Sequence, residues 1–174
     1  CRIGPVMSRQ KQKFNIVSLG CARNLVDSEV MAGLLQKNDY QIVQQAEDAD
    51  IVLVNTCGFI GPAKEESIET ILEVSRLKEE GKVKKLVVAG CLSQRYPDEL
   101  ARELPEVDLF IGTGEVPRIG EILREHDANS IPRKYIGLPN YLYDHTTPRL
   151  RSTPSYTTFL KVSEGCDHKC AFCI

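Results

Sequence analysis

The cysteines close to the end of the sequence are the residues whose spacing points most directly to chemistry. Cys166, Cys170 and Cys173 form a CxxxCxxC pattern in the segment EGCDHKCAFCI. Three thiols this close together suit disulfide formation poorly, whereas thiolates are the usual ligands of a 4Fe-4S cluster. Three thiolates can hold three of its irons and leave the fourth iron open to a substrate. Phe172 is expected to shield such a cluster or to pack against a bound nucleoside, and ordinary core packing is the simpler alternative.

Three further cysteines occupy equivalent places along the chain. Each follows the end of a predicted strand and has a glycine beside it, and the pairs are Gly20–Cys21, Cys57–Gly58 and Gly90–Cys91. The ends of parallel strands meet at one edge of a sheet, which is where open α/β folds place their ligands. We therefore predict that Cys21, Cys57 and Cys91 share a second metal site. Backbone N–H groups of the glycines would then be free to hydrogen-bond the sulfurs of a cluster there.

Two other interpretations of these loop cysteines stay open at the level of sequence. A buried cysteine often serves only as a small apolar residue. Zinc also binds thiolates, but a structural zinc site normally takes four protein ligands. A fourth cysteine is not available for this set, and none of His126, His145 and His168 lies in an equivalent loop. We expect His168, inside the CxxxCxxC segment, to be an exposed loop residue.

The overall composition limits the class of protein. Seven cysteines are an odd number, which argues against a closed disulfide framework. Residues 1–13 lack the apolar stretch of an export signal, and no apolar run approaches the ~20 residues that span a bilayer. These features favour a cytoplasmic protein without membrane association. A net charge of -2 provides no general electrostatic attraction to nucleic acid.

Apolar runs and helical periods alternate along residues 12–127. Strands are predicted at 14–20, 50–57, 85–91 and 108–113, and helices at 25–37, 62–80, 97–104 and 116–125. This alternation predicts right-handed crossovers and an open, three-layer, parallel α/β sheet. Prolines, glycines and tyrosines interrupt any period over 128–152, which is interpreted as a linker with a short strand at 133–136. Strand character returns at 157–166.

Charged residues lie early in the first two predicted helices. For Asp27, Ser28 and Glu29 we expect that the acidic groups complement the positive end of the helix dipole. Contact with a substrate or with a cluster is the alternative. Residues 64–66, a lysine and two glutamates, are expected to form a solvated helix face.

The motifs together resemble those of a known enzyme family. CxxxCxxC after a strand, with an aromatic residue before its last cysteine, is similar to the motif of the radical S-adenosylmethionine superfamily. SLGCARNLVDSEVMAGLL, VNTCGFI with AKEESIETIL, and AGCLSQRY resemble the amino-terminal domain of methylthiotransferases. The resemblance covers residues 14–174. It implies a flavodoxin-like amino-terminal domain over 12–127, followed at 153–174 by the first strand of a truncated radical S-adenosylmethionine barrel.

What this resemblance implies is an enzyme with two 4Fe-4S clusters. The CxxxCxxC triplet matches the ligands whose open iron chelates S-adenosylmethionine and generates a 5′-deoxyadenosyl radical. The three loop cysteines match the ligands of an auxiliary cluster that carries the sulfur to be delivered. The motifs are most similar to the branch that adds a methylthio group to the β-carbon of an aspartate in small-subunit ribosomal protein S-twelve. The implied partners are that protein or the small ribosomal subunit, and an electron donor of flavodoxin or ferredoxin type.

Two alternatives accompany this assignment. Within the family, another branch modifies adenosines of transfer RNA. A non-catalytic metal-binding module, flavodoxin-like or zinc-stabilised, is the alternative of another class. Ala22–Arg23 also departs from the proline and lysine of many similar chains. The sequence is interpreted as a fragment of a longer protein whose natural start is Met7. No catalytic side chain is assigned in this fragment. We expect the fragment to be inactive alone.

Overall fold

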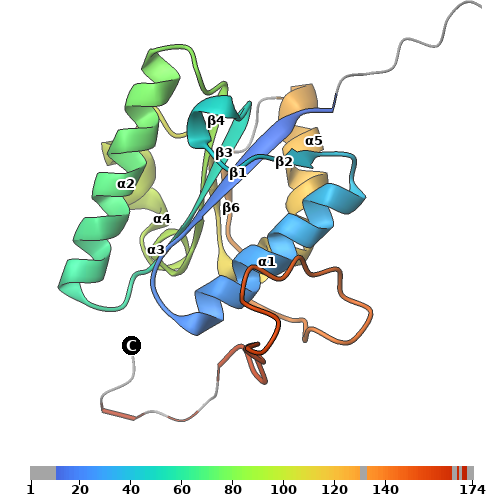
Figure 1. Cartoon of the computed structure of the whole chain (residues 1–174). Coiled ribbons are helices and arrows are strands. Elements are labelled where there is room, and N and C mark those ends of the chain that lie inside the picture. Colours follow the sequence, from blue (N-terminus) through green and yellow to red (C-terminus); the bar gives the residue numbers. More distant parts are fainter. Residues whose placement is uncertain (1–10, 130–132, 166–167, 169, 172–174) are drawn as a thin grey trace, which may run out of the picture.

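The computed structural model of the chain describes residues 11–129, 133–165, 168, 170 and 171. Six parallel strands form one sheet in the order β2-β1-β3-β4-β5-β6 (Figure 1). Their bounds are β1 (Lys13–Ser18), β2 (Gln41–Ile42), β3 (Ile51–Thr56), β4 (Lys85–Gly90), β5 (Leu109–Ile111) and β6 (Lys134–Tyr135). The predicted α/β class with an open parallel sheet is confirmed.

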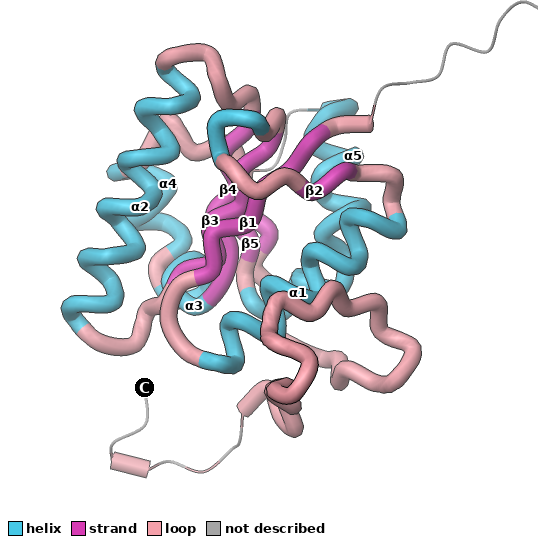
Figure 2. Tube along the Cα trace, in the orientation of Figure 1, coloured by secondary structure: helices cyan, strands magenta, loops and turns pink. Residues whose placement is uncertain are grey.

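Helices cover both faces of the sheet and complete the three expected layers (Figure 2). On one face lie α1 (Ala22–Lys37) and α5 (Ile119–Asn129), and on the other lie α2 (Gly61–Glu79) and α4 (Pro97–Glu103). Shorter helical pieces connect them, namely η1 (Ala46–Asp48), α3 (Cys91–Arg95) and η2 (Thr113–Arg118). Among the described residues, no helix combines the length and the apolarity needed to cross a membrane.

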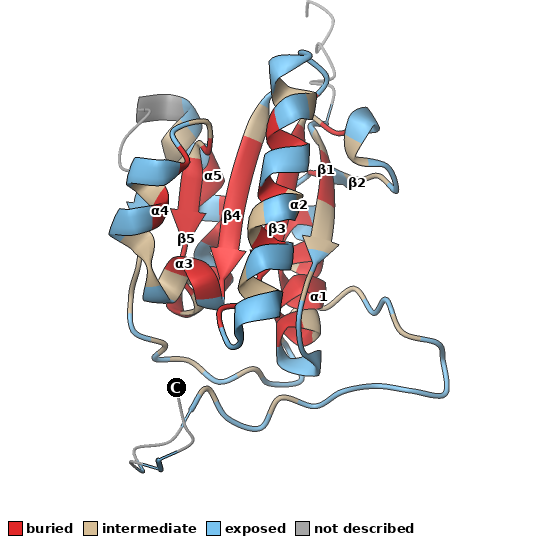
Figure 3. Ribbon diagram, turned by 90° about the vertical axis from the view of Figure 1, so that its left-hand side faces the viewer, coloured by how far each residue is buried: buried red, intermediate tan, exposed pale blue. Residues whose placement is uncertain are grey.

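The alternation of side chains along β3 divides the hydrophobic core into two halves. Ile51 and Leu53 join the cluster that includes residues of α1 and α5, whereas Val52 and Val54 join the cluster that includes residues of α2 and α4. All four are at most 2% exposed. A strand covered on both faces must be apolar at every position, which explains its unbroken hydrophobic run. Figure 3 shows these buried strands between helices whose outer faces are exposed.

The predicted elements agree with the structure except at short or unpaired segments. The sequence prediction omits β2 and α3, which span two and five residues and are too short to show a period. The short strand predicted at 133–136 is confirmed as β6. The strand predicted at 157–166 is wrong over its described part, because residues 157–165 pair with no strand there. An alternating pattern becomes a strand only where a neighbouring strand accepts its hydrogen bonds.

After β6, the chain leaves the sheet and crosses α1 between Asp27 and Gly33. We call residues 141–164 the strap; it is the orange-to-red loop beside α1 in Figure 1. The contact is close at Gly33, where an added Cβ would lie 2.7 Å from the backbone nitrogen of Arg149. The backbone N–H of Leu150 also donates to the carbonyl oxygen of Glu29, at 2.9 Å. Part of the segment interpreted as a linker is therefore packed against this domain.

Candidate functional site

The three loop cysteines lie at the carboxyl ends of three neighbouring strands. Cys21 precedes α1 after β1, Cys57 follows β3, and Cys91 begins α3 directly after β4. Because β1, β3 and β4 are adjacent and parallel, all three loops open at the same edge of the sheet. Cys57 is 8% exposed, whereas Cys21 and Cys91 are exposed to solvent.

Glycines allow these loops to approach one another closely. Gly20 has φ 87°, and a Cβ added there would lie 2.7 Å from Cβ and 3.0 Å from Sγ of Cys57. A Cβ added to Gly58 would lie 3.2 Å from the carbonyl carbon of Cys91. The Cys57 loop therefore contacts both of the other cysteine loops. Only glycine combines a positive φ with the missing side chain that this approach at Gly20 requires.

Asn24 ties the three loops together, and the sequence analysis missed it. Its side-chain Nδ2 donates to the carbonyl oxygens of Leu19, at 3.0 Å, and Thr56, at 2.8 Å. Its Oδ1 accepts from Sγ of Cys91, at 3.6 Å. Asn24 is 2% exposed although it lies in the first turns of α1. An asparagine inside a helix next to a cysteine motif is a weak signal, since such residues more often cap helices or bond locally.

A second layer of polar side chains supports Asn24 and Cys57. Asn55 donates from Nδ2 to the carbonyl oxygen of Asn24, at 2.8 Å, and to Oγ of Ser28, at 2.9 Å. The hydroxyl of Ser67, on α2, accepts from the backbone N–H of Cys57 at 3.1 Å. Oδ1 of Asn55 is buried and has no hydrogen-bond partner among the described residues. This edge of the sheet is thus a buried polar network inside an otherwise apolar core.

The charge environment of Cys91 reflects how close the three cysteines are. Desolvation by the surrounding loops raises the pKa of its thiol, and Cys21, Cys57 and Asp27 raise it further because negative groups repel a thiolate. Arg23 acts in the opposite direction. The Cys91 thiol is therefore protonated at neutral pH in the metal-free protein, which agrees with its donating a hydrogen bond to Asn24.

The donor chemistry of this edge fits an iron–sulfur group better than a structural zinc ion. The structure brings together three thiols and, among the residues it describes, no fourth ligand, while closed zinc sites take four. Within the part of the chain that the structure describes, however, no three Cys, His, Asp or Glu side chains are arranged as a metal-binding group. The loops are thus assembled, and the three sulfurs are not in coordinating positions.

The CxxxCxxC triplet falls mostly outside the described residues. Cys166, Phe172 and Cys173 lie there, so their predicted roles stay predictions. Cys170 is described and exposed. His168 is also exposed, as the sequence analysis expected.

The expectation for Asp27, Ser28 and Glu29 is wrong. All three are buried, at 4%, 5% and 2% exposure, and no acidic residue lies in the first turn of α1, where it could complement the dipole. Ser28 donates to the hydroxyl of Ser18, and the two carboxylates bind cations of the strap. For residues 64–66, the expected solvated face is confirmed for the two glutamates, which are exposed, while Lys64 is half-buried over the ring of Tyr96.

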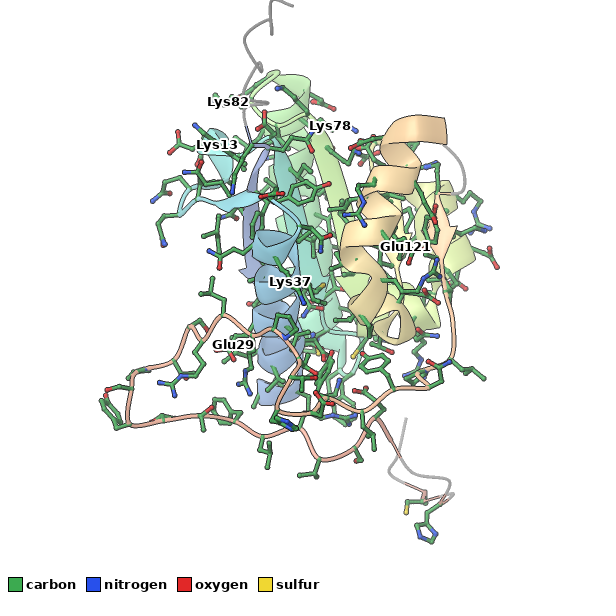
Figure 4. All side chains as sticks on the ribbon, turned by 90° about the vertical axis from the view of Figure 1, so that its right-hand side faces the viewer. Lys13, Glu29, Lys37, Lys78, Lys82 and Glu121 are labelled. Atoms are coloured by element: carbon green, nitrogen blue, oxygen red, sulfur yellow. The ribbon has the colours of Figure 1, made fainter. Side chains whose placement is uncertain are left out.

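Glu29 is the anchor of the strap on α1. Its Oε2 accepts from Nε of Arg149 at 2.7 Å, and its Oε1 accepts from both the backbone N–H and the hydroxyl of Ser152, at 2.7 and 2.8 Å. Burial acts to raise the pKa of Glu29, but the bonds from Ser152 and Arg149 outweigh it and lower the pKa. Figure 4 shows Glu29 where the strap passes α1.

Comparisons with known proteins identify the family and several relatives of this chain. Residues 13–112 match the family described as "Uncharacterized protein family UPF0004". A ribosomal protein uS12 methylthiotransferase RimO of Syntrophotalea carbinolica is 54% identical over 167 residues, which are 96% of this chain and 37% of the relative. Its counterpart in Geobacter sulfurreducens is 52% identical over 168 residues, 97% of this chain and 38% of the relative. That of Myxococcus xanthus is 54% identical over 159 residues, 91% of this chain and 33% of the relative.

The chain spans 33% to 38% of the length of these relatives. The matched family region covers more than half of the chain and contains Cys21, Cys57 and Cys91 together with the asparagine that joins their loops. The chain therefore belongs to the family UPF0004 and is similar, over nearly all of its length, to methylthiotransferases of the RimO type.

Proposed function

We propose that this chain is part of a radical S-adenosylmethionine methylthiotransferase that modifies an aspartate of ribosomal protein uS12 at its β-carbon. The observation that carries the proposal is the convergence of three cysteine loops at one sheet edge, in a chain that also contains a CxxxCxxC triplet. The names of the relatives support the substrate, since those described above are uS12 methylthiotransferases. The electron donor is expected to be a flavodoxin or ferredoxin.

Each cysteine set would hold one 4Fe-4S cluster. Cys21, Cys57 and Cys91 would bind the auxiliary cluster, and the CxxxCxxC triplet would bind the other one together with S-adenosylmethionine. These cofactors supply the one-electron chemistry that substitution at an unactivated C–H bond requires, which acid–base side chains cannot supply. The role of the surrounding protein is to hold the thiols in place and to limit water.

The residues around the loop cysteines are suited to that role. Asn24 holds the three loops in a fixed relation through its hydrogen bonds to Leu19, Thr56 and Cys91. Ser67 fixes the backbone of Cys57 from the opposite helix. Burial, and then the neighbouring negative groups, raise the pKa of Cys91 in the metal-free chain, and bound cluster irons would offset both effects by stabilising the thiolate.

Cluster assembly is the first test. The chain is reconstituted anaerobically with iron and sulfide, and its iron and sulfide contents are measured together with its electron paramagnetic resonance spectrum. We expect about eight irons per chain, and about four after Cys57→Ala. Cys1→Ser is the matched control, because Cys1 belongs to neither set, and it should leave the iron content unchanged. Stoichiometric zinc without colour would instead indicate a zinc-stabilised module.

The substrate needs a second test, on the chain extended to the length of its relatives. A strain lacking the gene is complemented with the parent or with Cys57→Ala. Mass spectrometry of uS12 should show a methylthio group only with the parent. A modification found in digested transfer RNA and not in uS12 would contradict the substrate assignment and leave the family assignment intact.

A further inference from the structure

Within the strap, a lysine side chain is buried at a position where an apolar one would be expected. Over residues 157–165, Lys161 has a side chain that is 4% exposed. Its neighbours Leu160 and Val162 are 82% and 78% exposed. The usual pattern is inverted, since apolar groups face solvent and an ammonium group is inside. Burying a charge is costly unless it is paired and hydrogen-bonded, so the lysine must be held by specific partners.

Those partners form a continuous polar chain on α1 and the strap. Nζ of Lys161 lies 2.7 Å from Oδ1 and 2.9 Å from Oδ2 of Asp27, and 2.7 Å from Oε1 of Glu164. The Tyr143 hydroxyl donates to Oδ1 of Asp27 at 2.7 Å, and the ammonium lies 5.3 Å from the centroid of that ring. The Tyr141 hydroxyl lies 3.1 Å from that of Tyr143. Both ends of the ion pair are therefore enclosed, since Asp27 is itself 4% exposed.

A buried ion pair of this kind contributes more to the register of the strap on α1 than to the stability of the fold. Desolvation offsets most of the attraction within such a pair, so its net contribution to stability is small, while a shift of the strap by one residue would separate Lys161 from Asp27, its partner on α1. Apolar burial cannot hold this part of the strap, because its large apolar side chains are exposed. Two further hydrogen bonds reach backbone oxygens of this part of the strap, from Arg23 to Ser163 and from Arg149 to Phe159.

The two ends of the pair lie near the two cysteine sets. Asp27 is six residues after Cys21 on α1, a rise of about 9 Å along the helix. Lys161 precedes the first cysteine of the CxxxCxxC triplet by five residues, which span at most about 17 Å. Fixing this lysine on α1 therefore limits where the triplet can lie relative to the loop cysteines.

We propose that Asp27 and Lys161 are positioning residues that set the approach of the CxxxCxxC triplet to the loop-cysteine site. The inference rests on the proposed two-cluster function, in which the groups held by the two sets must meet one substrate. Neither residue needs to touch the clusters. The ion pair of Asp27 and Lys161 would instead narrow the range of distances between the loop cysteines and the CxxxCxxC triplet.

The test measures that distribution without iron. Nitroxide labels are attached to Cys21 and Cys170, both exposed, in a chain whose other five cysteines are serines. Pulsed electron paramagnetic resonance then gives the distance distribution, which should be narrow with Asp27 and Lys161 present. In the double variant Asp27→Asn, Lys161→Met the width should at least double. A broad distribution in the parent, or equal widths in both, would overturn the proposal.

A second measurement separates positioning from stability. The single variants Asp27→Asn and Lys161→Met each take a counter-charge away from a buried charge and should unfold at lower urea concentration than the double variant. In the double variant, hydrogen exchange of the amides of 157–165 should still be at least tenfold faster than in the parent. The control is Glu80→Gln, Lys82→Met, which removes an exposed pair at the far end of the molecule, where Figure 4 labels Lys82. Unchanged exchange in the Asp27, Lys161 double variant would contradict the proposal, whereas a parent chain that binds no iron would contradict only the proposed function.

Discussion

The two long helices α1 and α2 both carry acidic residues in their first half, but these residues have different surroundings. Glu29 of α1 is 2% exposed, whereas Glu66 of α2 is exposed. The difference comes from segments distant in sequence, since Arg149 and Ser152 cover α1 and no described segment covers the acidic face of α2. Burial of a charged residue is therefore decided by what packs over it and not by its position in the helix.

The largest expected effect contrasts one glutamate from each helix. Glu29→Ala leaves Arg149 without its carboxylate and Ser152 without an acceptor, and should lower the free energy of unfolding by about 3–4 kcal/mol. Glu66→Ala, on the exposed face of α2, should change it by less than about 0.5 kcal/mol. Urea denaturation measures both. Equal effects of the two substitutions would show that the strap does not cover α1 in solution.

The starts of the two helices provide a second contrast. Gly20→Ala forces a side chain into a positive φ and against Cys57, and should lower the free energy of unfolding by about 2–3 kcal/mol. Gly61, the first residue of α2, has open space around it, so Gly61→Ala should be neutral or slightly stabilising. Thermal unfolding compares the two variants. A neutral Gly20→Ala would contradict the close approach of the β1 and β3 loops.

Polar side chains from both helices hold the Cys57 loop, and they differ in how many loops they join. Asn24→Ala removes bonds to three cysteine loops and should cost about 2 kcal/mol, whereas Ser67→Ala affects one loop and should cost about 1 kcal/mol. Alkylation of Cys57 in the iron-free chain should be faster in both variants, and faster with Asn24→Ala. The reverse order would place the main support of this loop on α2.

The smallest effect is a dependence on pH. The pKa of Glu29 is lower in the folded chain than its unfolded value of about 4.3, so its contribution to stability is complete above that pH. The contribution is lost as the pH falls below about 4.3 and through the folded pKa. The difference in unfolding free energy between the parent and Glu29→Gln should therefore shrink with acidification over this range. A difference that stays constant down to pH 3 would show that the Glu29 carboxylate gains nothing from the strap.

Much of the fold follows from local patterns in the sequence. Continuous apolar runs such as that of β3 identify strands covered on both faces, and the places of the cysteines after parallel strands correctly indicate that their loops open at one edge of the sheet. Short elements such as β2 leave no period to detect. Over residues 157–165, by contrast, the sequence predicts a strand that does not form, because this segment has an alternating pattern but no neighbouring strand to pair with.

By itself, the sequence determines that cysteines follow three successive strands, and strand direction in a parallel sheet then brings their loops to one edge. Local spacing alone also defines the CxxxCxxC triplet. Only the tertiary structure decides that Asn24 joins the three loops, that Glu29 anchors the strap and that Lys161 is buried on Asp27. Those contacts link residues up to 134 positions apart, and their partners are chosen by packing geometry, which no local pattern encodes.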